Sequence, residues 1–153
     1  MRRLLALLVL LVLPVAAGNA QGDPPGVKGL FLLTDYPSQT VRAGETTTLR
    51  VKVNNAGLVP EPLALSLQGV PAGWKADILG GGQPVAAVMA GVNQDVTVQL
   101  RVEVPKDAKP GSQNLVLNAK GQNLQQASLP LTLTVGTEVP AKLSGRDAKN
   151  DLA

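Results

Sequence analysis

Hydrophobic and polar residues alternate along most of the segment 30–135, which turn sequences divide into short pieces. In residues 45–53 the alternation separates aliphatic from polar side chains: inward Leu49, Val51 and Val53, and outward Thr46, Thr48, Arg50 and Lys52. Successive strand residues point to opposite sides of a sheet, so this pattern predicts a strand with one buried face. Residues 95–104 repeat it with aliphatic residues at alternate positions, and a register shift of one residue would bury Arg101.

Other segments show the same period with less contrast. Leucines alternate with small or polar residues at 63–67 and 129–135, and weaker alternation occurs at 30–33, 39–41, 74–78, 84–89 and 114–119. The segments 30–33 and 39–41 flank Tyr36-Pro37-Ser38, which predicts one strand that switches between two sheets. Pro130 cannot donate a backbone hydrogen bond, so its strand is expected at a sheet edge or at a bulge.

Nothing in the chain predicts a helix, because no segment carries apolar residues at helical spacing together with start and stop signals. Gly, Pro and Asn instead mark reversals between the expected strands, at 42–44, 54–57, 70–73, 80–82 and 109–111. We therefore predict an all-β fold, an immunoglobulin-like antiparallel β-sandwich of about seven to nine strands.

Both ends of the chain differ from this central segment. Residues 1–20 have a basic start, an apolar run and small residues before Ala20, the pattern of a secretory signal peptide cleaved after Ala17 or Ala20. An uncleaved signal anchor is the alternative. Residues 21–29 are expected to form a flexible lead-in, 30–136 the sandwich domain, and 137–153 a polar, disordered tail or the start of a linker.

The N-terminal pattern predicts where in the cell the protein is found. A cleaved signal peptide predicts a protein that is secreted, or that lies in the periplasm or cell envelope. Such a protein meets the membrane only transiently, through the signal peptide itself.

The composition excludes several kinds of chemistry. The chain has no Cys and no His, which excludes disulfides, thiolate nucleophiles, imidazole bases and metal sites built from these residues. Its acidic residues are dispersed and form no calcium-binding loop. Gly80-Gly81-Gly82 lacks the Lys-Ser/Thr ending of a phosphate-binding loop. We expect no cofactor and no metal.

The charge of the chain argues against a nucleic-acid partner. Lys and Arg outnumber Asp and Glu by 14 to 11, for a net charge of +3, and loss of Arg2 and Arg3 with the signal peptide would leave +1. The remaining basic residues are scattered with acidic residues between them, whereas binding to phosphates requires a basic stripe.

The residues present allow two kinds of hydrolytic site. The serines have no His as a general base, which leaves a Ser–Lys pair as the alternative: Ser38, Ser66, Ser112 and Ser128. Four aspartates near strand ends offer paired carboxylates for glycoside hydrolysis: Asp35, Asp77, Asp95 and Asp107. Aspartate is also common at turns, where it hydrogen-bonds the local backbone. We predict that the chain is not an enzyme and has no catalytic residue.

Aromatic residues are scarce, at 2% of the chain, and comprise Phe31, Tyr36 and Trp74. Trp74 is the one weak candidate for ligand binding, since an exposed indole would stack on a sugar or on a partner protein. It shares the inward parity of Ala76 and Ile78, which favours a place in the core.

An ordered series of short motifs resembles a known family. They are Tyr36-Pro37-Ser38, the sequence VRAGE at 41–45, LRVKVNNAG at 49–57, LQGVPAGW at 67–74 and VEVPKDAKPG at 102–111. Together they look like the Ig-like domain associated with NPCBM carbohydrate-binding modules and with α-galactosidases, which also occurs in bacterial envelope proteins.

The resemblance implies a sandwich fold, export, and an accessory role beside other domains, and it carries over no catalytic residue. The function expected from these observations is that of an exported, non-catalytic interaction or spacer module at the cell envelope, with an envelope protein or a glycan as its partner. The alternative is a carbohydrate-binding accessory domain of the kind found beside α-galactosidases.

Overall fold

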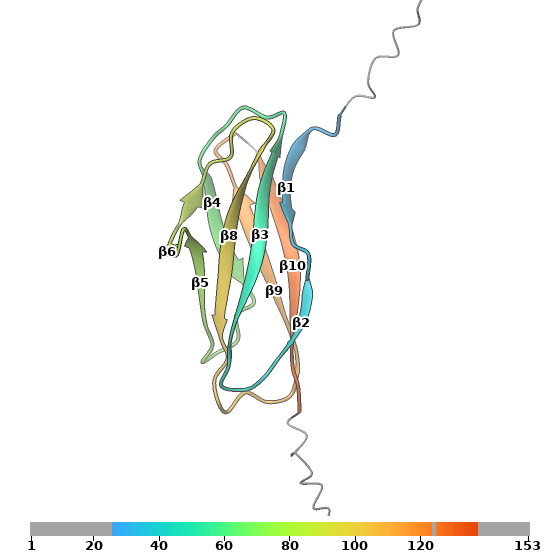
Figure 1. Ribbon diagram of the computed structural model, residues 1–153, viewed down its shortest axis with the longest axis vertical. Coiled ribbons are helices and arrows are strands. Elements are labelled where there is room, and N and C mark those ends of the chain that lie inside the picture. Colours follow the sequence, from blue (N-terminus) through green and yellow to red (C-terminus); the bar gives the residue numbers. More distant parts are fainter. Residues whose placement is uncertain (1–25, 124, 138–153) are drawn as a thin grey trace, which may run out of the picture.

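The computed structural model describes residues 26–123 and 125–137, which form two five-stranded sheets packed face to face (Figure 1). The first sheet has the order β1 (Gly29–Leu33), β3 (Thr46–Ala56), β8 (Gln94–Glu103), β5 (Lys75–Gly80) and β6 (Gln83–Pro84). The second has the order β2 (Ser38–Val41), β10 (Gln126–Val135), β9 (Gly111–Lys120), β4 (Leu63–Gln68) and β7 (Ala87–Val88). These residues include no helix, and so none that could cross a membrane.

The predicted sandwich is confirmed, with ten strands, of which β6 and β7 have two residues each. The predicted signal peptide 1–20, the first part of the lead-in and the tail from residue 138 lie outside the described residues.

Alternation along the central strands builds the core. Leu49, Val51 and Val53 on β3 are at most 1% exposed, and their neighbours Arg50 and Lys52 are exposed. The predicted inward residues of β8, and Val104 directly after it, are buried in the same way, apart from partly exposed Val96: Val98, Leu100, Val102 and Val104. The two sheets therefore meet mainly through aliphatic side chains, as the period of two predicts.

The strand expected to switch sheets does so. β1 pairs antiparallel with β3, and the chain then crosses at Pro37 so that β2 pairs with β10 of the other sheet. Because the chain crosses without reversing, β2 keeps the direction of β1 and runs parallel to β10. This parallel pair is the one departure from the antiparallel pattern among the described strand pairings.

Pro130 lies where β10 is a sheet edge, as its missing N–H requires. The Thr132 N–H donates to Pro37 O at 2.8 Å, so it points toward the β2 side of the strand. Pro130, two residues earlier, has the same orientation, and β2 pairs only with residues from Thr132 onward. The prolyl nitrogen therefore points to a side of β10 on which, among the described strands, none pairs with this part of β10.

The single strand expected at 84–89 is instead two short strands in different sheets. β6 pairs with β5, and β7 pairs with β4. Between them Val85 N donates to Ile78 O, and Ala86 O accepts from Leu65 N, both at 2.9 Å. The chain crosses here from one sheet to the other, so neither sheet can hold the whole segment.

We expect Leu117→Ala to lower the free energy of unfolding by about 3 kcal/mol, because it leaves a cavity among close-packed aliphatic side chains. Leu117 is 0% exposed, whereas Leu33 is 52% exposed and provides the control substitution Leu33→Ala. Urea unfolding of both variants measures the difference. Equal stabilities for the two would contradict the assignment of Leu117 to the core.

Candidate functional site

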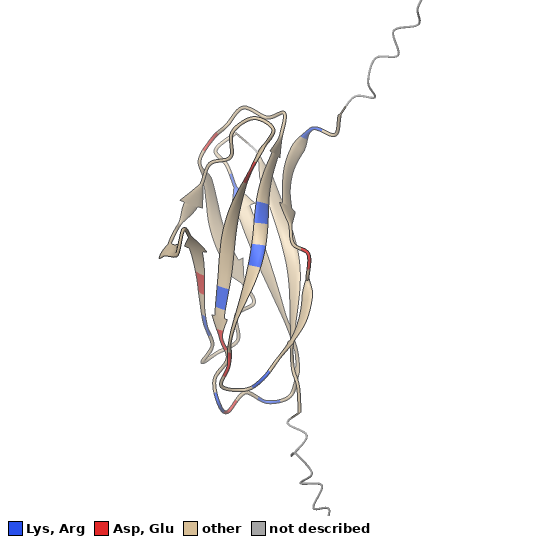
Figure 2. Cartoon of the chain, in the orientation of Figure 1, with Lys and Arg blue, Asp and Glu red and all other residues tan. Residues whose placement is uncertain are grey.

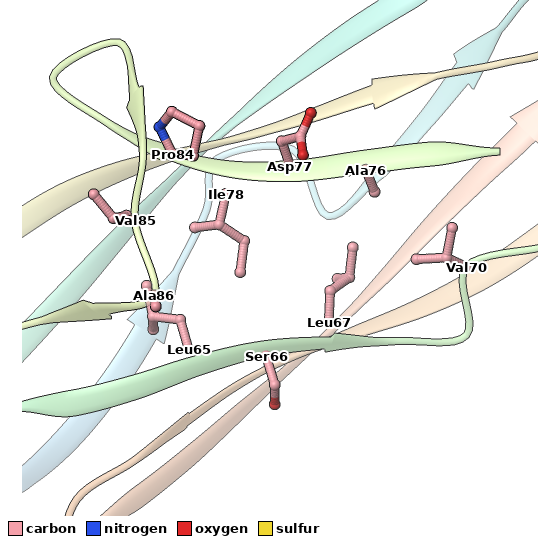
Figure 3. A pocket seen from close by; sticks show the side chains of 10 residues that line it. All are labelled: Leu65, Ser66, Leu67, Val70, Ala76, Asp77, Ile78, Pro84, Val85 and Ala86. Carbon is pink, nitrogen blue, oxygen red and sulfur yellow. The ribbon is translucent and has the colours of Figure 1, made fainter.

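A groove opens between the two sheets where β4 and β5 face one another (Figure 3). Its volume is about 470 Å³, and we call it the β4–β5 groove. Leu67 points up from β4, Ile78 and Ala76 point down from β5, and Val70 points in from the loop that follows β4. All four are only partly buried, whereas inward residues of β3 and β9 at the centre of each sheet are fully buried.

The free edge of β5 presents the backbone of residues whose side chains face this groove. Ile78 O accepts from Val85 N, so the backbone groups of Ile78 point away from β8. Ala76, two residues earlier, has the same orientation, and its N–H and C=O therefore face the open edge. β6 reaches only Leu79 and Gly80, which leaves β5 without an outer neighbour from Lys75 to Asp77.

β4 presents its edge in the same way. Leu65 N donates to Ala86 O, so the N–H of Leu65 points away from β9. Leu67 shares this orientation, and β7 pairs only with Leu63 and Ala64. The crossing segment from β6 to β7 thus closes one end of the groove and leaves the rest bounded by two unpaired edges.

Charged residues are spread over the strands and over the loops at both ends of the sandwich (Figure 2). Of the residues that line the β4–β5 groove, Asp77 is the one that carries a charge. Arg101 on β8 bonds Glu103 at 3.0 Å. Lys75 and Asp77 on β5 are exposed and flank Ala76 on either side. A separate polar hollow of about 710 Å³ on the first sheet is lined by Asp35, Arg50, Lys52, Thr97 and Gln99, among others.

The candidate hydrolytic residues occupy separate places. Ser112 bonds Thr134 at 3.1 Å and Ser128 bonds Asn118 at 2.6 Å, both on the outer face of the second sheet. Asp95 accepts a hydrogen bond from Asn54 Nδ2 at 2.7 Å on the first sheet. Asp77 lies at the rim of the β4–β5 groove, and Asp35 lines the polar hollow. Within 26–123 and 125–137, no three carboxylates gather as metal ligands would.

Trp74 lies directly before β5 and is partly buried. Its side chain packs against the core cluster that contains Leu100, Leu115 and Leu131. Its backbone N–H donates to Pro71 O at 3.1 Å, which holds it in the turn between β4 and β5. The structure thus places Trp74 at the inward position that its parity predicts, and a role in ligand binding stays a prediction.

Sequence reasoning missed Glu61, a carboxylate only 8% exposed. Its Oε2 accepts from the backbone N–H groups of Gln122 and Asn123 and from Asn123 Nδ2, each at 3.0 Å. Among the residues that the structure describes, its buried Oε1 has no hydrogen-bond partner, and a Cβ on Gly121 would overlap this atom. Glu61 therefore ties the β3–β4 connection to the β9–β10 hairpin, and its position between Pro60 and Pro62 was the only sequence signal.

Asn55 holds the same end of the sandwich. Its side chain is 3% exposed, and its Nδ2 donates to Leu58 O at 3.0 Å and to Ala90 O at 3.1 Å. Its Oδ1 accepts from Leu58 N at 2.9 Å. The sequence marked this region as a turn, but the partner Ala90 is far along the chain and has no local signal.

Comparison with known proteins decides the family. The sequence model described as "NPCBM-associated, NEW3 domain of alpha-galactosidase" matches residues 41–122, more than half of the chain. The chain belongs to the NEW3 domain family. The matched residues run from the end of β2 through β9, so they include both walls of the β4–β5 groove of this NEW3 domain.

Solved structures share the fold at low identity. The NEW3 domain aligns with CaCohA2 from Clostridium acetobutylicum at 11% identity and a TM-score of 0.54, over 74% of this chain and 94% of that one. It aligns with a family 123 glycoside hydrolase from Clostridium perfringens at 11% identity and a TM-score of 0.53, over 65% of this chain. The chain spans only 23% of that hydrolase. No curated protein matches the sequence.

We expect Trp74→Ala to cost about 3 kcal/mol of stability, because the indole is the largest side chain packed against its core cluster. Thermal and urea unfolding measure the loss. Tyr36 is 68% exposed, so Tyr36→Ala is a matched aromatic control with little expected change. A Trp74→Ala variant that unfolds like the wild type would contradict core packing.

Glu61→Ala is expected to lower the free energy of unfolding by about 2 kcal/mol, because two backbone N–H groups that donate to this buried carboxylate would lose their acceptor. Glu45, which is exposed and 3.8 Å from Arg42, provides the control Glu45→Ala with a change near zero. Urea unfolding compares the two variants, and equal effects would show that Glu61 does not hold the hairpin.

Proposed function

We propose that this NEW3 domain is an exported, non-catalytic module that acts as an interaction or spacer domain at the cell envelope, and that it contacts its partner through the β4–β5 groove. The observation that carries the proposal is an apolar groove bounded by two unpaired strand edges. Family membership supports an accessory role, and the pattern of residues 1–20 supports export.

The groove has the features of a contact surface. Unpaired edges are usually blocked by inward-pointing charges, bulges or covering loops, because they accept other strands. Here the inward residues at the free edges are Ala76 and Leu67, and the covering segment from β6 to β7 reaches only one end. Partly exposed aliphatic side chains next to free backbone groups favour association with another polypeptide.

A protein partner is favoured over a glycan for this surface. Glycan binding commonly relies on an exposed aromatic ring with polar groups around it, whereas the β4–β5 groove is lined by aliphatic side chains. Of the three aromatic residues, Tyr36 is the exposed one, and it lies in the β1–β2 connection on the other side of the sandwich.

Site-specific photocrosslinking in the envelope tests the proposal. A benzophenone amino acid in place of Ala86, whose exposed side chain lies at the groove, is expected to give crosslinked products. The same group in place of Tyr36 provides the control. Adding Leu67→Gln, which makes the groove polar, should reduce the products. Absence of products from position 86, or equal yields from both positions, would refute the proposed contact surface.

A further inference from the structure

We propose that the partner at this edge is a second copy of the chain, which pairs β5 antiparallel with its own β5 around a two-fold axis through Ala76. This inference rests on the proposed role of the open edge as a contact surface. It names the occupant of that edge, and it joins the first sheets of two sandwiches into one continuous sheet.

The backbone geometry allows this pairing at Ala76. Its N–H and C=O both face the open edge, as the orientation of Ile78 shows. In a two-fold antiparallel pair, the Ala76 N–H donates to the Ala76 C=O of the second copy, and the second copy returns the same bond. Both methyl groups then point to the groove side of the sheet.

The charges on either side of Ala76 are complementary to those of a second copy of β5 related by the two-fold axis. Antiparallel pairing centred on residue 76 places Lys75 directly opposite Asp77 of the second copy, and Asp77 opposite the other Lys75. Both side chains are exposed on the outer face of the sheet, where directly opposite residues are close enough to interact.

Neither charge forms a close ion pair with another described residue of its own chain. In the register with β8, Lys75 lies opposite Glu103 and Asp77 lies opposite Arg101. Glu103 and Arg101 bond each other at 3.0 Å instead. Among the described residues, no ion pair shorter than 4.0 Å includes Lys75 or Asp77. A second copy would offer each of them a further opposite charge on the free side of β5.

The fold also limits the extent of the contact. β6 occupies the same edge at Leu79 and Gly80, so pairing between the two copies covers Lys75 to Asp77. The partly exposed side chains of Leu67 and Val70 then lie beside the junction and add apolar contact. An interface this small predicts a reversible dimer.

Charge reversal tests the pairing by sedimentation equilibrium of the protein purified after export. Wild type is expected to show a monomer–dimer equilibrium. Lys75→Asp places two acids opposite each other, and Asp77→Lys places two lysines opposite each other, so each variant should dissociate at least about tenfold more readily. An equimolar mixture of the two variants restores every opposite-charge pair and should form heterodimers. Lys106→Asp, at an exposed loop position, provides the charge control.

The outcomes separate this inference from the proposed function. Wild type that stays monomeric at millimolar concentration, or variants that dimerise as well as wild type, would overturn the β5 pairing. Far-UV circular dichroism of each variant identifies those that keep the native fold. Failure of two correctly folded variants to associate when mixed would also overturn the pairing. If position 86 still crosslinks to another protein while the chain is monomeric, the proposed function stands and the self-pairing falls.

Discussion

Contact between the two aliphatic faces is the interaction on which the rest of the structure depends. The chain has no cysteine, so no disulfide links the sheets, and the packed side chains of β3, β8, β9 and β10 hold them together. Register is part of this interaction, since Val51 lies opposite Val98 on the buried side while Arg50 and Arg101 stay in water. A shift of one residue would bury charge and expose aliphatic surface on both strands at once.

The same alternation produces the groove. Inward residues at the centre of each sheet are covered by the opposite sheet, but β4 and β5 have neighbours along only part of their outer edges. Their inward side chains, such as Leu67 and Ile78, are therefore only partly buried. The groove arises here without any specialised residue, because a two-layer sandwich that is not closed on one side must leave apolar groups near solvent.

Polar residues hold one end of the sandwich, beyond the packed aliphatic core. Glu61 joins two connections that are distant in sequence, and Asn55 joins the end of β3 to the segment before β8. Buried polar groups are tolerated because each accepts or donates several hydrogen bonds, apart from Glu61 Oε1. These residues orient the loops at one end and do not touch the groove.

The sequence by itself determined the class of fold, the inward and outward faces of the main strands, the switch from β1 to β2 and the place of Pro130, since each follows from the period of two or from the geometry of one residue. It did not determine that residues 84–89 divide between two sheets, or that Glu61 and Asn55 are buried. Their partners lie far along the chain, and a local pattern carries no information about distant segments. The groove and the free edge at Ala76 likewise depend on which strands lie side by side, so only the tertiary structure decided where this module is left open.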